Sequence, residues 1–409
     1  MLLKKSENYL YPLFLSLFLF SCEDKPLIIE DDDLSLKIDT VSFLASESLT
    51  YQVPPTLGGS KKIYIGKNDQ FDFEYALVRF DKTASRRFDP LNGNLIDDFI
   101  DYNDTLLTLD SLDLSLYFTS DSVNSSSIFQ LHYYPNAVDS VFSQTQTNYT
   151  NLNPNFSKII SRGKVFTDTS YSLSRLSFEI DTSDFSLFMD TSNASFNNTF
   201  LISILSNENQ VYELFSVNEG SNYPILSVFF NYQINDSTTI DTFNIHNSVE
   251  DLSILKPPNL ASLDTSNLSI SLAKGLKSLL IIDTEDWVLP HGSVIRNAEL
   301  LLHPISIDTS DASIINSYPV SGALFPSDFQ SYLSDPFTYN INYGVSSVIA
   351  NDIKFNHRLG SNDFFKNNNS LHVFNLQSSS LNNPFKTISF HSKNSTEFYP
   401  KLRILYVTP

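Results

Sequence analysis

Hydrophobic and polar residues alternate with a period of two along much of this chain. In the segment 111–118, Leu112, Leu114, Leu116 and Phe118 fall on one face and polar residues on the other. Successive side chains of a β-strand point to opposite faces, so this pattern predicts a strand with one buried face. Further strands are expected at 62–65, 76–80, 200–205, 226–232, 279–282, 299–302, 371–376, 387–390 and 401–407.

Long amphipathic helical patterns are absent from the sequence. Three short stretches, 184–189, 327–333 and 345–353, have a spacing that predicts a turn or two of helix between strands. The 33 Phe and 20 Tyr supply ample apolar area to bury, and abundant Ser, Asn, Asp and Thr suit polar turns. The sequence therefore predicts an all-β fold.

A repeated pattern divides the chain into two halves. An apolar strand, a loop that ends in Tyr-Pro and a final alternating strand occur at 214–229 and again at 390–405. Proline suits the first position of such a strand, because its missing N–H costs no hydrogen bond there. We therefore expect two tandem domains, 38–234 and 235–409, joined by a polar link at 235–242.

The repeat unit also resembles a known family of domains. The opening Ile63-Tyr-Ile-Gly66, the strand Ala76-Leu-Val-Arg-Phe-Asp81, the strand 112–118 and the close Tyr399-Pro-Lys-Leu-Arg-Ile-Leu-Tyr406 look like DNRLRE-type domains. These domains are jelly-roll sandwiches related to carbohydrate-binding modules and occur on bacterial surface proteins. The resemblance implies two tandem jelly-roll-like antiparallel β-sandwiches with a binding or structural role. It carries over no catalytic residue.

The first 21 residues have the three parts of a bacterial signal peptide. Two lysines precede an apolar stretch at 9–20, which is followed by a small residue and Cys22. The stretch is too short to span a bilayer as a helix, and Pro12 interrupts it. Leu19-Phe20-Ser21-Cys22 resembles a lipobox, which implies cleavage before Cys22 and lipidation of that residue. An uncleaved apolar anchor is the alternative.

Cys22 is the only cysteine, so the chain can form no internal disulfide. The acidic segment 22–37 that follows has little to bury and predicts a solvated tether. Acidic residues directly after a lipidated cysteine also resemble the surface-export signal of Bacteroidota lipoproteins. We expect a protein anchored by lipid to the outer membrane, facing either the periplasm or the cell surface.

The formal net charge of −20 narrows the choice of partners. An acidic surface repels phosphate backbones and anionic headgroups, so nucleic acid is not an expected partner. Contact with the membrane is expected through the lipid anchor. Polysaccharides and other surface proteins are the remaining expected partners.

Motifs for catalysis or cofactor binding are missing from the sequence. The seven histidines include no metalloprotease pair, and the Gly-x-Ser-x-Gly, phosphate-loop and dinucleotide motifs are absent. No cofactor or metal is therefore expected. Asp-Thr-Ser-Asp/Asn recurs at 181–184, 190–193, 264–267 and 308–311 and predicts turns between strands, with a calcium loop as the alternative.

The densest polar cluster surrounds Trp287, the only tryptophan. Asp283, Glu285 and Asp286 precede it directly, and His291 follows. Two carboxylates and a histidine could serve as an acid/base site. Alternatively, the segment is a solvated loop in which Trp287 caps the sandwich. A third interpretation is sugar binding, in which the indole stacks on a sugar ring and the carboxylates accept hydroxyl hydrogen bonds.

Tyr133 and Tyr134, beside His132, are a second candidate for an aromatic binding surface. Three functions therefore compete. A non-catalytic binding or adhesion lipoprotein, with a glycan as one candidate ligand, is favoured. A structural component of the cell envelope is the alternative, and a glycan-active hydrolase is third. Exposed aromatics in a row would favour sugar binding, a long unpaired edge strand would favour assembly, and two facing carboxyl groups would favour the hydrolase.

Overall fold

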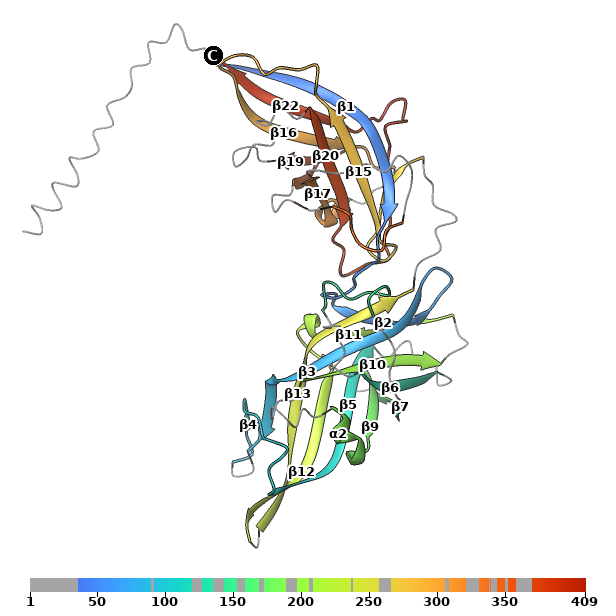
Figure 1. Ribbon diagram of the computed structural model, residues 1–409, viewed down its shortest axis with the longest axis vertical. Coiled ribbons are helices and arrows are strands. Elements are labelled where there is room, and N and C mark those ends of the chain that lie inside the picture. Colours follow the sequence, from blue (N-terminus) through green and yellow to red (C-terminus); the bar gives the residue numbers. More distant parts are fainter. Residues whose placement is uncertain are drawn as a thin grey trace, which may run out of the picture.

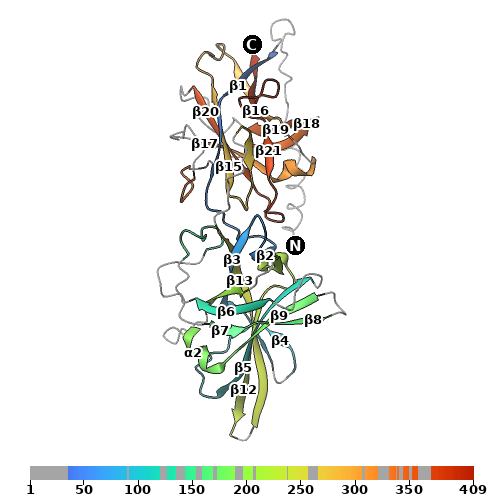
Figure 2. The same cartoon turned by 90° about the vertical axis from the view of Figure 1, so that its right-hand side faces the viewer.

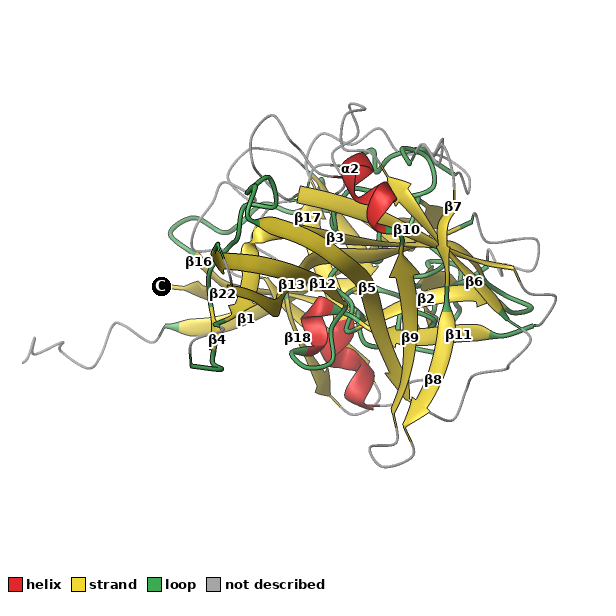
Figure 3. Ribbon diagram, turned by 90° about the horizontal axis from the view of Figure 1, so that it is seen from below, coloured by secondary structure: helices red, strands yellow, loops and turns green. Residues whose placement is uncertain are grey.

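Almost all regular structure in the protein is antiparallel β-sheet (Figures 1 and 3). The predicted all-β fold is therefore confirmed. The helix α2 (Phe185–Phe188) is four residues long. Within the described ranges, no helix has both the length and the apolar character that a membrane span requires. The computed structural model describes residues 36–89, 92–119, 127–134, 143–152, 159–168, 173–188, 197–205, 209–236, 238–256, 266–305, 309–320, 331–337, 339, 344–349, 352–357 and 370–409.

One body of the protein takes strands from both ends of the chain. β1 (Lys37–Gln52) pairs over its first half with β22 (Lys401–Thr408) and over its second half with β15 (Leu276–Asp283). The full order is β17-β20-β15-β1-β22-β16-β19-β18. We call this body the terminal sandwich. Its other strands are β16 (Val294–Leu302), β17 (Ile315–Val320), β18 (Val345–Ile349), β19 (Asp352–His357) and β20 (Leu371–Ser378), with the separate pair β14 (Leu268–Ile270) and β21 (Ile388–Phe390).

β1 pairs with β22 and then with β15, and both of these strands contribute side chains to the same core. Pairing with β22 ends at Leu44 and pairing with β15 begins at Ala45, where a register shift follows between Ala45 and Glu47. Apolar side chains from both sides of this strand meet in one fully buried cluster, which includes Leu280, Phe374, Leu300 and Ile404. β1 is thus the strand that joins the two halves of the sandwich.

The second body lies in the sequence between β1 and β14, and we call it the inserted sandwich. Its strands β13, β12, β5, β11, β2 and β3 form a closed circuit, because β13 pairs with both β12 and β3. β6, β7, β8, β9 and β10 extend this circuit. The bounds are β2 (Lys62–Lys67), β3 (Asp72–Phe88), β4 (Leu95–Ile96), β5 (Leu107–Thr119), β6 (Ile128–Tyr134), β7 (Ile159–Arg162), β8 (Lys164–Asp168), β9 (Leu173–Ile180), β10 (Asn197–Leu205), β11 (Val211–Phe215), β12 (Ile225–Asn235) and β13 (Thr238–Leu255).

The core of the inserted sandwich follows the predicted alternation. Leu112, Leu114, Leu116 and Phe118 of β5 are all buried in it, as expected from their shared face. Two final strands also begin where the Tyr-Pro pattern predicts, since β12 starts after Pro224 and β22 after Pro400. The local strand pattern was therefore readable from the sequence.

The strand pairings contradict the expected boundary between residues 234 and 235. β13, assigned to the second domain, pairs along its length with β12 and β3 of the inserted sandwich. The expected link 235–242 contains instead the turn of the β12–β13 hairpin and the start of β13. β1, assigned to the first domain, belongs to the terminal sandwich. One sandwich is therefore inserted in the other, and the two are not in tandem.

The two sandwiches lie end to end and contact each other (Figures 1 and 2). The Ser60 hydroxyl donates a hydrogen bond of 2.6 Å to the carbonyl of Leu381. The rings of Tyr64 and Phe385 meet edge to face, with centroids 5.0 Å apart. Aromatic pairs of this kind stabilise a contact beyond the area that they bury. The junction is thus a packed apolar contact as well as a double crossing of the chain.

The helical predictions had mixed outcomes. The short helix expected at 184–189 is confirmed by α2, which follows a 3₁₀ turn at Thr182–Asp184. The backbone N–H of Ser183 donates to the Asp181 side chain at 2.8 Å, as expected for the Asp-Thr-Ser turn. The prediction at 345–353 was wrong, because its β-branched residues form β18 and the start of β19. The segment 327–333 lies mostly outside the described residues, as do Cys22, the signal peptide and most of the tether.

Candidate functional sites

Trp287 lies against the terminal sandwich core and is half-buried. Its ring centroid is 5.7 Å from that of Phe43 on β1 and 5.7 Å from that of Tyr406 on β22. Both neighbours belong to strands that close the sandwich. This position agrees with the capping interpretation, although part of the indole stays accessible.

The acidic residues before Trp287 form a solvated turn. Asp283, Glu285 and Asp286 are all exposed, and so is His291. The Asp283 carboxylate accepts a 2.9 Å hydrogen bond from the backbone N–H of Glu285. Such a bond two residues along is the local pairing of an Asx turn. Asp283 therefore has a local structural role, whether or not a ligand binds nearby.

Tyr133 and Tyr134 lie on β6 of the inserted sandwich, in the other body from Trp287. Tyr134 is 6% exposed, and Tyr133 packs against the main core. The two aromatic candidates therefore cannot form one site. Tyr134 is buried and Tyr133 is half-buried.

A cavity of about 400 Å³ lies beside His132, on the inserted sandwich. This volume is within the range of small-ligand pockets. Side chains from neighbouring strands form its wall: Tyr75 from β3, Ser203 from β10 and His132 from β6. Their sheet face is the one opposite the main core, because Ala76 and Val78 point into that core.

Four charged side chains also line this cavity, and their charges cancel. Lys67 and Lys256 are cationic, whereas Asp72 and Glu74 are anionic. The Lys256 ammonium lies 3.2 Å from Asp72 and 3.5 Å from Glu74. Burial alone would lower the pKa of Lys256, but its contacts with Asp72 and Glu74 raise it above the ordinary value. The wall is therefore polar and has no net charge.

His132 is a neutral polar group of the cavity wall. Burial lowers its pKa below the ordinary value, so the imidazole is uncharged at neutral pH. Its Nε2 lies 2.9 Å from the Ser203 hydroxyl. Burial, followed by the nearby Glu74, raises the pKa of Tyr75, which keeps this phenol protonated. The wall thus offers hydroxyl, ammonium and carboxylate groups together with the aromatic residues Phe73 and Tyr75.

Gly66 fixes the edge of the cavity. Its φ of +103° is in a region that favours glycine, and a Cβ there would lie 2.4 Å from the carbonyl oxygen of Gln210. β2 and β11 can therefore approach closely at this point. A side chain at Gly66 would force the two strands apart and deform the cavity.

Sequence reasoning noticed His132 but missed the rest of this cavity. Its residues come from strands far apart in the sequence. Hydrophobic alternation predicts which face of a strand is buried, but it does not predict which strands pair with it. The one available signal was Asp72 and Glu74 in alternation with Phe73 and Tyr75, which places polar groups at the start of a buried strand.

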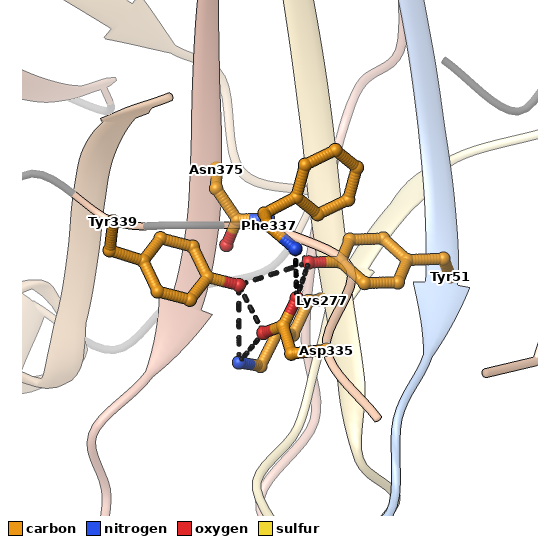
Figure 4. A network of polar contacts seen from close by, with 6 residues as sticks. All are labelled: Tyr51, Lys277, Asp335, Phe337, Tyr339 and Asn375. Atoms are coloured by element: carbon orange, nitrogen blue, oxygen red, sulfur yellow. Dashed lines mark hydrogen bonds and ion pairs between the residues drawn. The ribbon is translucent and has the colours of Figure 1, made fainter. Parts of the chain in front are cut away.

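A second polar cluster lies on the terminal sandwich and was not predicted at all (Figure 4). Lys277 of β15 is 2.5 Å from the Asp335 carboxylate, and both side chains are about one-fifth exposed. Tyr339 donates to the same carboxylate oxygen. Tyr51 of β1 lies 3.4 Å from the other oxygen and receives a 2.6 Å bond from Asn375 of β20.

The surroundings of this cluster are unusually apolar for an ion pair. Tyr51 packs edge to face on Phe337, with centroids 5.4 Å apart, in a separate apolar cluster on the outer side of the sheet. Burial lowers the pKa of Lys277, although Asp335 acts against this shift. Burial also raises the pKa of Tyr51 and of Tyr339, so both phenols stay protonated.

No family model, no curated protein and no solved structure matches this chain. Among the residues that the structure describes, no group of three or more His, Cys, Asp and Glu side chains is arranged to hold a metal ion.

Proposed function

We propose that the protein is a lipid-anchored, extracytoplasmic binding protein that takes a neutral glycan at the cavity of the inserted sandwich. The cavity, with Tyr75 and with two cations and two carboxylates in its wall, is the observation that carries this proposal. Sugars present hydroxyl groups and apolar ring faces, which need hydrogen-bonding groups and an aromatic surface. A wall without net charge favours a neutral glycan over a phosphate or another strong anion.

Several features favour binding over hydrolysis. Asp72 and Glu74 share one ammonium group, that of Lys256. A glycoside hydrolase needs one carboxyl group kept protonated by apolar surroundings, next to a second that is ionised. A cation that contacts both Asp72 and Glu74 stabilises the ionised form of each and does not keep either one protonated. We therefore infer that these carboxylates accept hydrogen bonds from a ligand and do not cleave it.

The path of the chain supports anchoring through Cys22. β1 begins beside the end of β22, at the end of the terminal sandwich remote from the inserted sandwich (Figure 1). A signal peptide at 1–21, a lipid on Cys22 and a tether to Lys37 would hold the terminal sandwich next to the outer membrane. The inserted sandwich, with its cavity, would then extend away from the membrane.

Both sandwiches are proposed to be jelly-roll-like, as the family resemblance implies. The alternative function, assembly with other envelope proteins, has less support. Strands with one neighbour along their length are candidates for pairing with another chain. Among the described residues the longest of these strands is β17, with six residues, and the others, β4, β7, β8, β14, β18 and β21, have two to five. A glycan-array screen of the full chain, followed by titration of Tyr75→Ala, tests the proposed binding.

A further inference from the structure

We propose that Lys277 and Asp335 join through an intramolecular isopeptide bond between the lysine Nζ and the aspartate Cγ. The inference is independent of glycan binding and rests on the cluster of Figure 4. The Nζ of Lys277 and Oδ2 of Asp335 are 2.5 Å apart. The two residues come from β15 and from the segment 331–337, so the bond would tie this segment to the sheet.

The groups around the pair are those that amide formation needs. Oδ1 of Asp335 lies 3.4 Å from the Tyr51 hydroxyl and 3.2 Å from the backbone N–H of Phe337. Two donors on one oxygen can stabilise the negative charge that develops there during attack. Oδ2 accepts hydrogen bonds from the Lys277 Nζ and from the Tyr339 hydroxyl, and these two donor atoms lie 3.3 Å from each other.

The reaction is a balanced condensation without an oxidant or another reactant. The Lys277 ammonium first gives a proton to Oδ2, which leaves a neutral amine beside a carboxylic acid. The amine lone pair attacks Cγ, the C–N bond forms, and charge collects on Oδ1. A second proton then passes from nitrogen to Oδ2, directly or through Tyr339. The C–Oδ2 bond breaks and one water molecule leaves.

The site favours the uncharged amine on which attack depends. Burial lowers the pKa of Lys277, because an ammonium group is poorly solvated in apolar surroundings. Asn375, fully buried on β20, binds the Tyr51 hydroxyl and holds it near Asp335. These contacts fix the reacting atoms in place, which removes much of the entropic cost of the condensation.

Another buried pair in the same sandwich provides a contrast. Glu299 is bound by Lys354 at 2.9 Å and also by Arg403. Burial alone would raise the pKa of Glu299, but hydrogen bonds from the two cations hold it below the ordinary value. A second cation stabilises the carboxylate and opposes proton transfer from the lysine. We therefore expect Lys354 and Glu299 to stay an ion pair.

Peptide mapping of the full chain by mass spectrometry tests the proposal directly. The protein is denatured and digested with trypsin, which cleaves after lysine and arginine. In the wild type, a bond at Lys277 blocks cleavage there and joins residues 275–296 to 297–354 in one branched peptide. The mass of this peptide is smaller than the sum of its two parts by one water molecule. Cleavage after Lys354 is the internal control and must still occur.

Two variants separate the bond from the fold around it. Lys277→Arg keeps the positive charge beside Asp335 but removes the amine, and should release 278–296 and 297–354 as separate linear peptides. Tyr339→Phe should reduce the branched fraction several-fold without preventing folding. Separate linear peptides from the wild type would show that the pair is only ionic. A branched peptide that persists in Lys277→Arg would also overturn the assignment, because another lysine would be the donor.

Discussion

Lys37 and Thr408 are cross-strand partners, so the first described strand begins beside the end of the last. β1 and β22 then run together from this point as far as Leu44 and Lys401. The terminal sandwich is therefore closed by residues from opposite ends of the chain. Its folding requires both β1 and β22, whereas the inserted sandwich needs only the residues between β1 and β14.

This difference predicts which fragments fold. A fragment of residues 57–256 contains every strand of the inserted sandwich and should unfold cooperatively as a β-rich domain. A fragment of 38–234 lacks β13 and should not unfold cooperatively. The buried Leu252 and Ile254 are missing from it, and β3 and β12 each lose a neighbouring strand. Circular dichroism with thermal unfolding compares the two. Cooperative unfolding of 38–234 alone would contradict the inserted arrangement.

The sequence predicted the strands better than their partners. Alternation placed Leu112 and Leu114 on a buried face correctly, since period and burial are local properties. The partnership of β1 with β15 was not predictable in this way, because Thr50 meets Ser278 across more than two hundred residues of chain. A Tyr-Pro repeat likewise gives the start of two strands and says nothing about which body each joins.

Trp287→Ala should destabilise the terminal sandwich by about 1–3 kcal/mol, because it removes the half-buried indole and its contacts with Phe43 and Tyr406. The free energy of unfolding from denaturant titration measures this. Val288→Ala is the matched control: Val288 is 83% exposed, and its loss should change stability by less than about 0.5 kcal/mol. An unchanged Trp287→Ala would argue against capping and return the indole to the candidates for binding.

The protein should lose stability as the pH falls from 6.5 towards 4. Burial lowers the pKa of His246, His357 and His372 to about 4, against 6.5 for an ordinary histidine. In this window the unfolded chain binds protons that the folded chain excludes, so stability falls with pH. Asp251, whose pKa burial raises to about 6, acts in the opposite direction. Three histidines outweigh one aspartate, and the net loss should be on the order of a few kcal/mol.

His357→Gln tests the contribution of one of these histidines. The imidazole is buried, with its Nε2 3.2 Å from the Ser317 hydroxyl. A glutamine at this position does not titrate, so the fall in unfolding midpoint between pH 6.5 and 4 should become shallower. The same slope in the variant and the wild type would show that His357 does not contribute to acid sensitivity.

Cys22→Ser tests the lipid anchor. The variant should be released from membranes or accumulate as an unprocessed precursor, since a serine cannot be lipidated as the cysteine is. Fractionation of cells followed by mass analysis of the N-terminal peptide measures both outcomes. Unchanged membrane association, with the same N-terminal mass as the wild type, would contradict anchoring through Cys22.

The candidate site was less predictable than the fold. Trp287 and Tyr133 are aromatics near polar residues in the sequence, and both pack against cores, as Tyr75 also does, so packing alone does not single out a site. Tyr75 and Lys256 meet only because β3 and β13 are neighbours. A site built from residues of different strands depends on which strands pair, and the pattern of a single sequence does not give that pairing.

Isothermal titration of a glycan identified on the array tests the central claim most directly. Tyr75→Ala should weaken its binding about tenfold or more, which corresponds to roughly 1.4 kcal/mol. Trp287→Ala, in the other sandwich, should bind as the wild type does. Thermal unfolding confirms that each variant is folded, and Tyr75→Phe separates the ring from the hydroxyl. Equal affinity of Tyr75→Ala and the wild type, or a wild type that binds no glycan, would contradict the account.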